Sequence, residues 1–304
     1  MKTTRLRMAD TNPLNLYNVV ELWLSHLEAR GCSTNTITVY RFIVTTFIRE
    51  VGNIPITEVT PDTVRQYLIA RRRAGRSPQT IAGNYRTLNA LFAWAVKQNL
   101  IESNPCAYVD APKRERVIKH VPTPEEIETL LGACDGKDFV RVRDRALLLT
   151  LLDTGLRIHE CHQLRVGDVV QETFAVRGKG GRFRYVFLSG ETRLALVRYV
   201  KLLGNLPADA PLWWCRHKSK TLTLGGLKQA VENIGKRAGV KLSPHMLRRA
   251  FATWSLRNGV SLEHLRLLMG HSDLKTTQVY LTLLEDDLKT AHQQHSPVNL
   301  LKKR

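Results

Sequence analysis

Apolar side chains recur at helical spacing through the first hundred residues, in four stretches separated by polar or glycine-containing breaks. The second, third and fourth stretches each start at a serine or threonine, and two of these hydroxyl residues precede a proline, which is typical of a helix start. The predicted helices cover about residues 14–29, 34–50, 61–73 and 78–98. This pattern predicts a four-helix bundle joined by short loops.

The rest of the chain combines helices with one pair of strands. A strongly apolar run at 140–154 predicts a buried helix. Around a glycine-rich turn at 178–181, apolar and polar residues alternate from 172 to 188, which predicts a β-hairpin. Further helices are predicted at about 191–203, 223–238, 244–258, 261–270 and 284–294. The expected fold class is therefore mainly α: a four-helix domain followed by a mostly helical domain with a small antiparallel hairpin.

A change of composition marks the boundary between these two domains. Residues 104–121 hold proline and charged residues without periodicity, so we interpret them as a linker. The expected parts are a basic lead (1–12), the helical domain (13–103), the linker (104–121), the second domain (122–294) and a tail (295–304).

The charge indicates the class of partner. The 304 residues have a formal net charge of +19, which favours a polyanionic binding partner. Nucleic acid is the first expectation and an acidic membrane the second. No apolar run approaches the roughly 20 residues of a membrane-spanning helix, and the basic N-terminus lacks the apolar region of a signal peptide. The five cysteines are scattered, without a CxxC pair, which favours a reducing cytoplasm.

Candidate chemistry is concentrated between His245 and Tyr280. His245 and Arg248 lie three residues apart and would share one face of a helix. His271 follows a glycine that ends the next predicted helix, and Tyr280 follows after a polar run. This stretch offers a cation, two imidazoles and a phenol that folding could bring together.

Three further features have both a functional and a purely structural interpretation. Arg157 follows the apolar helix, and with Glu160 it would by itself indicate only a salt bridge. Lys179 at the hairpin turn would by itself be an ordinary exposed lysine. The turn is not a nucleotide-binding loop, because no helix follows it directly and the Lys-Ser/Thr pair is missing. The neighbours His159, Cys161 and His162 point in different directions on a helix, so we expect no metal there.

Basic and short polar residues are candidates for contacts with phosphate. In the first domain they gather around the start of the fourth predicted helix, although a solvated charged face is the usual alternative. The candidates are Arg71, Arg72, Arg73, Arg76, Ser77, Thr80 and Arg86, with Lys113 and Arg114 in the linker and Arg177, Arg182, Lys218 and Lys220 in the second domain.

Three ordered motifs resemble one known family. The pattern H-x-L-R followed by GHSDLKTTQVY is similar to box II of the tyrosine recombinases, the phage-integrase family, and TGLRIHE at 154–160 resembles box I. The sub-pattern is Xer-like. The resemblance implies that the first domain is a SAM-like core-binding domain and that the second is catalytic. It also implies that Lys179 is a mobile catalytic lysine on the hairpin.

The resemblance assigns a role to each candidate in phosphodiester transfer. Tyr280 would be the nucleophile, and Arg157 and Arg248 would clamp the phosphate. Lys179 would protonate the leaving 5′ oxygen, His245 would be the general base and His271 would bond a non-bridging oxygen. Glu160 would orient Arg157 or a histidine. No metal or cofactor is expected. His159 and Arg249 depart from the residues common in the family, and neither has one of these roles.

The expected function is site-specific recombination of double-stranded DNA through a covalent 3′-phosphotyrosyl intermediate and a Holliday junction. The resemblance implies a homotetramer on DNA that exchanges C-terminal tails, allows accessory proteins and involves no membrane. Two alternatives stay open: a type IB topoisomerase-like relaxing enzyme, and a non-catalytic architectural DNA-binding protein. The complete set of candidate catalytic residues argues against the second alternative.

Overall fold

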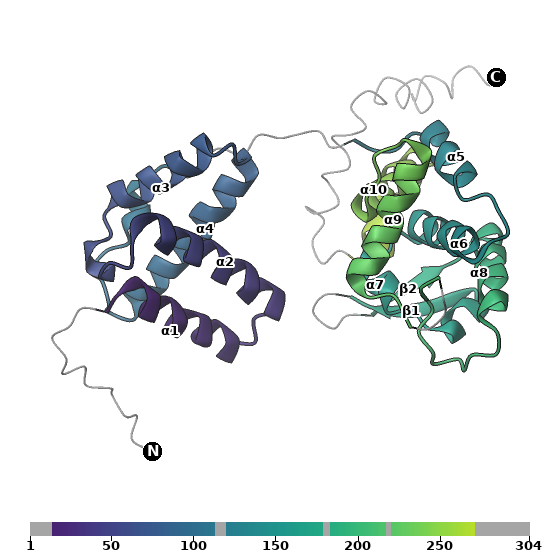
Figure 1. Cartoon of the computed structure of the whole chain (residues 1–304), viewed down its shortest axis with the longest axis horizontal. Coiled ribbons are helices and arrows are strands. Elements are labelled where there is room, and N and C mark those ends of the chain that lie inside the picture. The colour runs from purple at the N-terminus through teal and green to yellow at the C-terminus, as the bar shows by residue number, and fades with distance from the viewer. Residues whose placement is uncertain (1–13, 113–119, 179–182, 217–219, 271–304) are drawn as a thin grey trace, which may run out of the picture. The chain divides into compact units, whose positions relative to one another are not determined.

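The structure is a computed structural model that describes residues 14–112, 120–178, 183–216 and 220–270. The chain divides into two compact units, Met1–Val117 and Ile118–Arg304 (Figure 1). Each unit has its own hydrophobic core. Within the described residues, no helix combines the length and the apolar character needed to cross a membrane.

The N-terminal unit is the predicted four-helix bundle with two short 3₁₀ helices. Its elements are α1 (Leu16–Ala29), α2 (Thr34–Val51), η1 (Ile56–Glu58), α3 (Pro61–Arg73), α4 (Pro78–Lys97) and η2 (Pro105–Tyr108). The predicted starts are accurate because capping is local. The hydroxyl groups of Ser33, Thr60 and Ser77 each accept a hydrogen bond from the backbone N–H three residues later.

Aromatic side chains fill the centre of this bundle. Trp23, Phe47, Tyr67 and Phe92 are almost fully buried, and the Phe47 ring packs edge-on against the rings of Tyr67 and Phe92. The amide of Asn84 donates to the Tyr67 hydroxyl at 3.0 Å, so this buried phenol has a partner.

The predicted linker begins too early. Cys106 and Val109 belong to the core of the N-terminal unit, and η2 packs against α3 and α4. The Tyr85 hydroxyl lies 3.0 Å from the Cys106 carbonyl oxygen and 3.1 Å from that of Val109. Because these backbone groups are satisfied by a distant tyrosine, the absence of sequence periodicity in 104–109 does not indicate a free linker.

In its described residues, the C-terminal unit is mostly helical with one antiparallel strand pair, which confirms the predicted fold class. Its elements are α5 (Pro124–Gly132), α6 (Phe139–Thr154), α7 (Ile158–His162), η3 (Val166–Val170), β1 (Thr173–Arg177), β2 (Phe183–Phe187), α8 (Gly190–Leu203), α9 (Leu224–Ala238), α10 (Pro244–Arg257) and α11 (Leu262–Met269).

Helix α6 is the centre of this unit. It packs against α8 on one side and against α9 and α10 on the other (Figure 1). Its buried residues include Asp144, whose carboxylate accepts hydrogen bonds from Arg143 of the same helix and Arg237 of α9, both at 2.7 Å. A buried carboxylate with two guanidinium partners ties α9 to α6 without leaving an unpaired charge.

The predicted hairpin strands are confirmed, and the structure shows which side of each strand is buried. β1 pairs with β2 from Thr173 opposite Phe187 to Arg177 opposite Phe183. On β2 the aromatic residues Phe183 and Tyr185 face solvent, 72% and 69% exposed, whereas Arg184 between them is 8% exposed. Alternation alone does not indicate which of the two sets of residues on a strand faces the core.

Candidate active site

The site forms around the turn between α6 and α7. Gly155 ends α6 in the left-handed conformation, with φ of 57°, and a side chain there would collide with the ring of Phe251. The close packing of α10 against this turn therefore requires glycine. Arg157 follows two residues later as the N-cap residue of α7, and its side chain is partly exposed.

Glu160 holds Arg157 in place through two hydrogen bonds. The Arg157 guanidinium donates from Nη1 to Oε1 of Glu160 at 2.8 Å, and the Arg157 backbone N–H donates to Oε2 at 2.9 Å. The Glu160 side chain is fully buried, whereas the Arg157 side chain keeps 25% of its surface exposed. A fixed guanidinium with open surface can bind an anion.

Glu160 has a second arginine partner that the sequence did not suggest. Nη2 of Arg184, from β2, donates to Oε2 of Glu160 at 3.0 Å. Burial acts to raise the pKa of Glu160, but hydrogen bonds from the Arg157 backbone and from both guanidinium groups, with the Arg184 charge, outweigh it and lower the pKa. Glu160 is therefore an ionised carboxylate at neutral pH.

Arg248 connects the same turn to the end of α11. It lies on α10, is 5% exposed, and donates from Nη1 to the carbonyl oxygen of Gly155. Its Nη2 donates to the carbonyl oxygen of Met269 at 2.8 Å. The structure thus brings the backbone of the turn before Arg157 into contact with Arg248, although 93 residues separate Gly155 and Arg248.

Of the remaining predicted catalytic residues, the structure describes only His245. His245 is exposed in the first turn of α10, one turn before Arg248. Lys179, His271 and Tyr280 lie outside the described residues. Gly270, the residue before His271, is described and ends α11 with φ of 62°.

A cysteine next to Glu160 is not a candidate nucleophile. Cys161 is fully buried, and burial raises the pKa of its thiol far above neutrality.

The predicted DNA contacts divide into exposed, buried and undescribed residues. Arg71 is 9% exposed, and its Nη1 donates to Glu50 at 2.7 Å, so its guanidinium serves the N-terminal unit itself. The exposed candidates around the start of α4 are Arg72, Arg73, Arg76, Ser77, Thr80 and Arg86, and Lys220 is exposed in the C-terminal unit. The side chain of Arg177 and the residues Lys113, Arg114, Arg182 and Lys218 lie outside what the structure describes.

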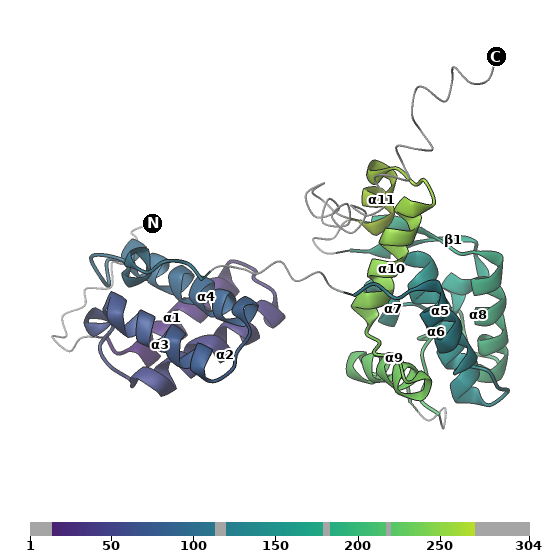
Figure 2. The same ribbon diagram turned by 90° about the horizontal axis from the view of Figure 1, so that it is seen from above.

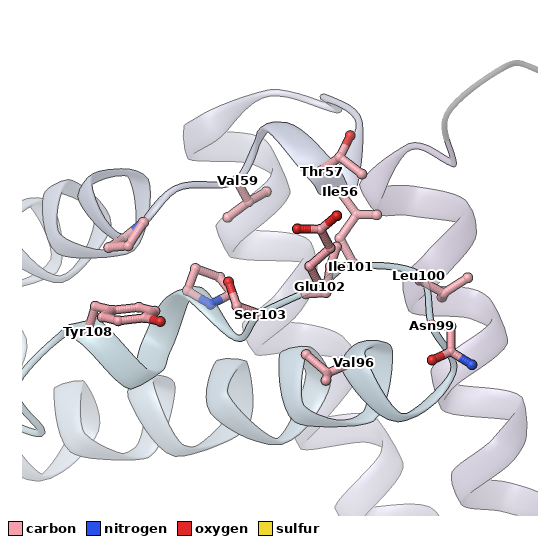
Figure 3. A pocket seen from close by; sticks show the side chains of 12 residues that line it. Ile56, Thr57, Val59, Val96, Asn99, Leu100, Ile101, Glu102, Ser103 and Tyr108 are labelled. Atoms are coloured by element: carbon pink, nitrogen blue, oxygen red, sulfur yellow. The ribbon is translucent and has the colours of Figure 1, made fainter.

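Two hollows mark the surface of the N-terminal unit. The smaller, about 90 Å³, lies beside the exposed basic residues, between Phe42 and Arg76. The larger, about 660 Å³, is lined by Ile56, Glu102 and Tyr108 among others (Figure 3). No lysine or arginine is among the described residues that line the larger hollow, so its walls do not favour a phosphate.

Comparison with known families identifies the chain. Residues 121–286, more than half of the sequence, match the model of the phage integrase family. The chain belongs to the phage integrase family. Residues 20–102 match the N-terminal SAM-like domain of phage integrases, in agreement with the two units of the structure.

Relatives within the phage integrase family narrow this to Xer-like tyrosine recombinases. Tyrosine recombinase XerC of Bacillus subtilis (strain 168) is 30% identical over 93% of this chain and 97% of its own. XerC of Roseiflexus castenholzii is 31% identical over 91% of this chain and 93% of its own. The chain is a Xer-like, site-specific tyrosine recombinase.

Solved structures share the fold. A lambda integrase dimer bound to a COC′ core site matches with a TM-score of 0.73 at 18% identity, over 88% of this chain and 77% of that chain. XerH recombinase bound to palindromic difH substrate in a post-cleavage complex matches with a TM-score of 0.71 at 24% identity, over 88% of this chain and 83% of that chain.

Proposed function

We propose that this recombinase cuts and rejoins double-stranded DNA through a covalent link to Tyr280. The Tyr280 phenol oxygen attacks the scissile phosphorus, a 3′-phosphotyrosyl bond forms and the bond from phosphorus to the 5′ oxygen breaks. His245 accepts the phenol proton and Lys179 gives a proton to the departing 5′ oxygen. In the reverse step a 5′ hydroxyl from a second strand attacks the phosphotyrosyl bond, so rejoining needs no external energy source.

The observation that supports this proposal is the placement of two arginines around one turn. Arg157 is fixed by buried Glu160, and Arg248 bonds the carbonyl of Gly155, two residues before Arg157. Guanidinium groups stabilise the negative charge that develops on phosphate oxygens in the transition state. In the proposed mechanism His271, which follows the end of α11, bonds one of these oxygens.

The N-terminal unit would supply a second contact with the DNA. The exposed side chains of Arg72, Arg73, Arg76 and Arg86 lie with Ser77 and Thr80 around the start of α4. Helix N-termini with hydroxyl groups and nearby arginines suit phosphate contacts that set orientation rather than read sequence. We assign residues 13–103 to core binding, together with the η2 segment that packs against α3 and α4, and residues 122–294 to catalysis.

The assembly proposed for the reaction is a homotetramer on two duplexes, with a Holliday junction as intermediate and with exchange of the tail at 295–304. The absence of a CxxC pair and the chemistry of DNA strand exchange favour the cytoplasm.

A nicked DNA substrate tests the proposed chemistry. Cleavage near the nick releases a short strand end, so rejoining fails and the covalent adduct accumulates on a denaturing gel. We expect wild type to form the adduct, and Tyr280→Phe to bind the same DNA on a native gel without forming it. Wild-type protein that binds the substrate but never forms an adduct would favour the architectural alternative. Relaxation of supercoiled plasmid without any exchange between two sites would favour the topoisomerase alternative.

A further inference from the structure

Arg184 occupies a position where a strand normally places an apolar side chain. Its neighbours Phe183 and Tyr185 are exposed, whereas the Arg184 side chain is 7% exposed. Burying a guanidinium costs free energy unless charged and polar partners offset that cost. An apolar side chain at position 184 would have avoided this cost, so the partners of Arg184 call for a functional explanation.

Those partners come from two other parts of the C-terminal unit. Nη2 of Arg184 donates to Glu160 at 3.0 Å, and Nη1 donates to the carbonyl oxygen of Leu268 in the last turn of α11. Helix α11 packs against both β2 and α10, and Figure 2 shows α11 beside α10. Gly270 makes room for the side chain, because a methyl group there would lie 2.6 Å from Cδ of Arg184.

These bonds complete a closed contact loop that contains both arginines of the proposed clamp. Arg184 reaches Arg157 through Glu160, and it reaches Arg248 through the end of α11, where the Leu268 carbonyl binds Arg184 and the Met269 carbonyl binds Arg248. The links of the contact loop run from Arg157 to Glu160, Arg184, Leu268 and Met269, Arg248 and Gly155.

The last carbonyls of a helix have no partner within the helix. Here two guanidinium groups donate to the carbonyls of Leu268 and Met269. Cations near a helix C-terminus also interact favourably with the helix dipole. Arg184 therefore fixes the end of α11 against the same turn that holds Arg157.

We propose that Arg184 is a positioning residue for strand cleavage: without touching DNA, it holds Arg157 and Arg248 at the separation that the phosphate requires. This inference rests on the proposed function of those two arginines. Arg184 acts on Arg157 by sharing the Glu160 carboxylate and on Arg248 by fixing the carbonyls of α11.

The test compares Arg184→Gln with a matched control, Arg193→Gln. Arg193 also pairs with a carboxylate, that of Glu172 at 2.6 Å, but on the surface of the same unit. At saturating nicked DNA, we expect Arg184→Gln to cleave about 10- to 100-fold more slowly than wild type, and the control to cleave at the wild-type rate. Arg184→Gln cleaving as fast as the control would overturn the proposal.

A neutral substrate separates positioning from general damage. When a methyl group replaces a non-bridging oxygen of the scissile phosphate, the clamp has less charge to stabilise. The defect of Arg184→Gln should then shrink to about threefold or less. A defect of equal size on both substrates would mean that Arg184 does not act through the clamp.

Two further variants test the same inference if Arg184→Gln alone cannot. If Arg184→Gln does not fold, Arg184→Lys keeps the charge but loses the fork that reaches Glu160 and Leu268 together, and it should show the same rescue by the neutral substrate. Arg184→Gln combined with Glu160→Gln should slow cleavage less than the product of the single effects, because both act through one network. If wild type itself forms no adduct, the proposed function fails. If wild type forms the adduct and the Arg184 variants cleave as fast as wild type, this inference alone fails.

Discussion

At the scale of single residues, Glu160 is the carboxylate that joins Arg157 to Arg184. It is fully buried and accepts hydrogen bonds from the Arg157 backbone, the Arg157 guanidinium and Arg184. Removing one partner from a buried ion pair leaves the other charge without compensation, and this is more damaging than never having had the pair.

We expect Glu160→Gln to lower the free energy of unfolding at pH 7 by about 3 kcal/mol, because Arg184 stays buried beside a neutral amide. The folded-state pKa of Glu160 lies below its ordinary value. Its stabilising effect is therefore complete above the unfolded pKa of about 4.3 and is lost as the pH falls through the lower folded pKa. Urea unfolding of wild type and variant from pH 7 to pH 3 should show the difference narrowing below pH 4. A difference that stays constant with pH would contradict this account.

Gly270, at the end of α11, offers a second prediction at this scale, and Gly259, before the start of α11, provides the control. In Gly270→Ala, the new side chain is strained by the left-handed backbone, φ of 62°, and it also collides with the Arg184 side chain. In Gly259→Ala, the only strain comes from the left-handed backbone, φ of 87°, because nothing lies within 4 Å of the new carbon. Gly259→Ala should therefore cost about 1 kcal/mol of unfolding free energy, and Gly270→Ala clearly more. Equal midpoints in urea would argue against the contact between Gly270 and Arg184.

At the scale of elements, the corner between α3 and α4 separates two kinds of arginine that look alike in the sequence. Arg71 turns inward to Glu50, and Arg72, Arg73 and Arg76 face solvent. The difference arises because successive residues at the end of α3 point in different directions around the helix, and only one direction meets α2.

This predicts different effects of two substitutions. Arg76→Ala should weaken DNA binding and reduce the slope of log affinity against log salt by about 0.9, the value for one lost phosphate contact. Arg71→Ala should leave that slope unchanged and lower the unfolding free energy by about 1–2 kcal/mol, because Glu50 loses its partner. Fluorescence anisotropy with labelled DNA in a potassium chloride series, together with urea unfolding, measures both. If Arg71→Ala reduced the slope of log affinity against log salt by about 0.9 as well, Arg71 would be a DNA contact after all.

At the scale of the whole molecule, each unit has its own main hydrophobic core in the residues that the structure describes. One includes Trp23, Phe47 and Phe92 of the N-terminal unit, and the other includes Leu147 and Trp213 of the C-terminal unit. No residue is shared between the two clusters, so neither unit needs the other to bury its core.

We therefore expect residues 1–112, expressed alone, to be helical and to unfold in one cooperative transition followed by circular dichroism. The fragment should include η2, since Cys106 and Val109 belong to the core. A shorter fragment that ends at residue 103 should have a clearly lower melting temperature, because those side chains are lost from the core and Tyr85 loses both of its carbonyl partners. Equal melting temperatures would show that the end of the N-terminal unit lies where the composition alone placed it.

The sequence by itself determined most of the helices within the described residues, the hairpin strands, the basic charge and the family; the helix predicted at 284–294 lies outside the described residues. Capping hydroxyls, prolines at helix starts and glycines at helix ends act over only a few residues, so Ser33, Thr60 and Gly270 mark their helix ends accurately. The pair of Arg157 and Glu160 was also predictable, because its members lie one helical turn apart.

Only the tertiary structure decided which charged residues are buried and what they bind. Arg184 and Glu160 are 24 residues apart, and Arg184 and Leu268 are 84 residues apart. Contacts over such separations depend on how β2, α7 and α11 pack, and no local pattern records that packing. The alternation on β2 allowed either face to be the inner one. In the structure the inner face holds Arg184 and Val186, opposite Val176 and Phe174 of β1. Glu160 and the Leu268 carbonyl, both distant in the sequence, offset the cost of burying the guanidinium.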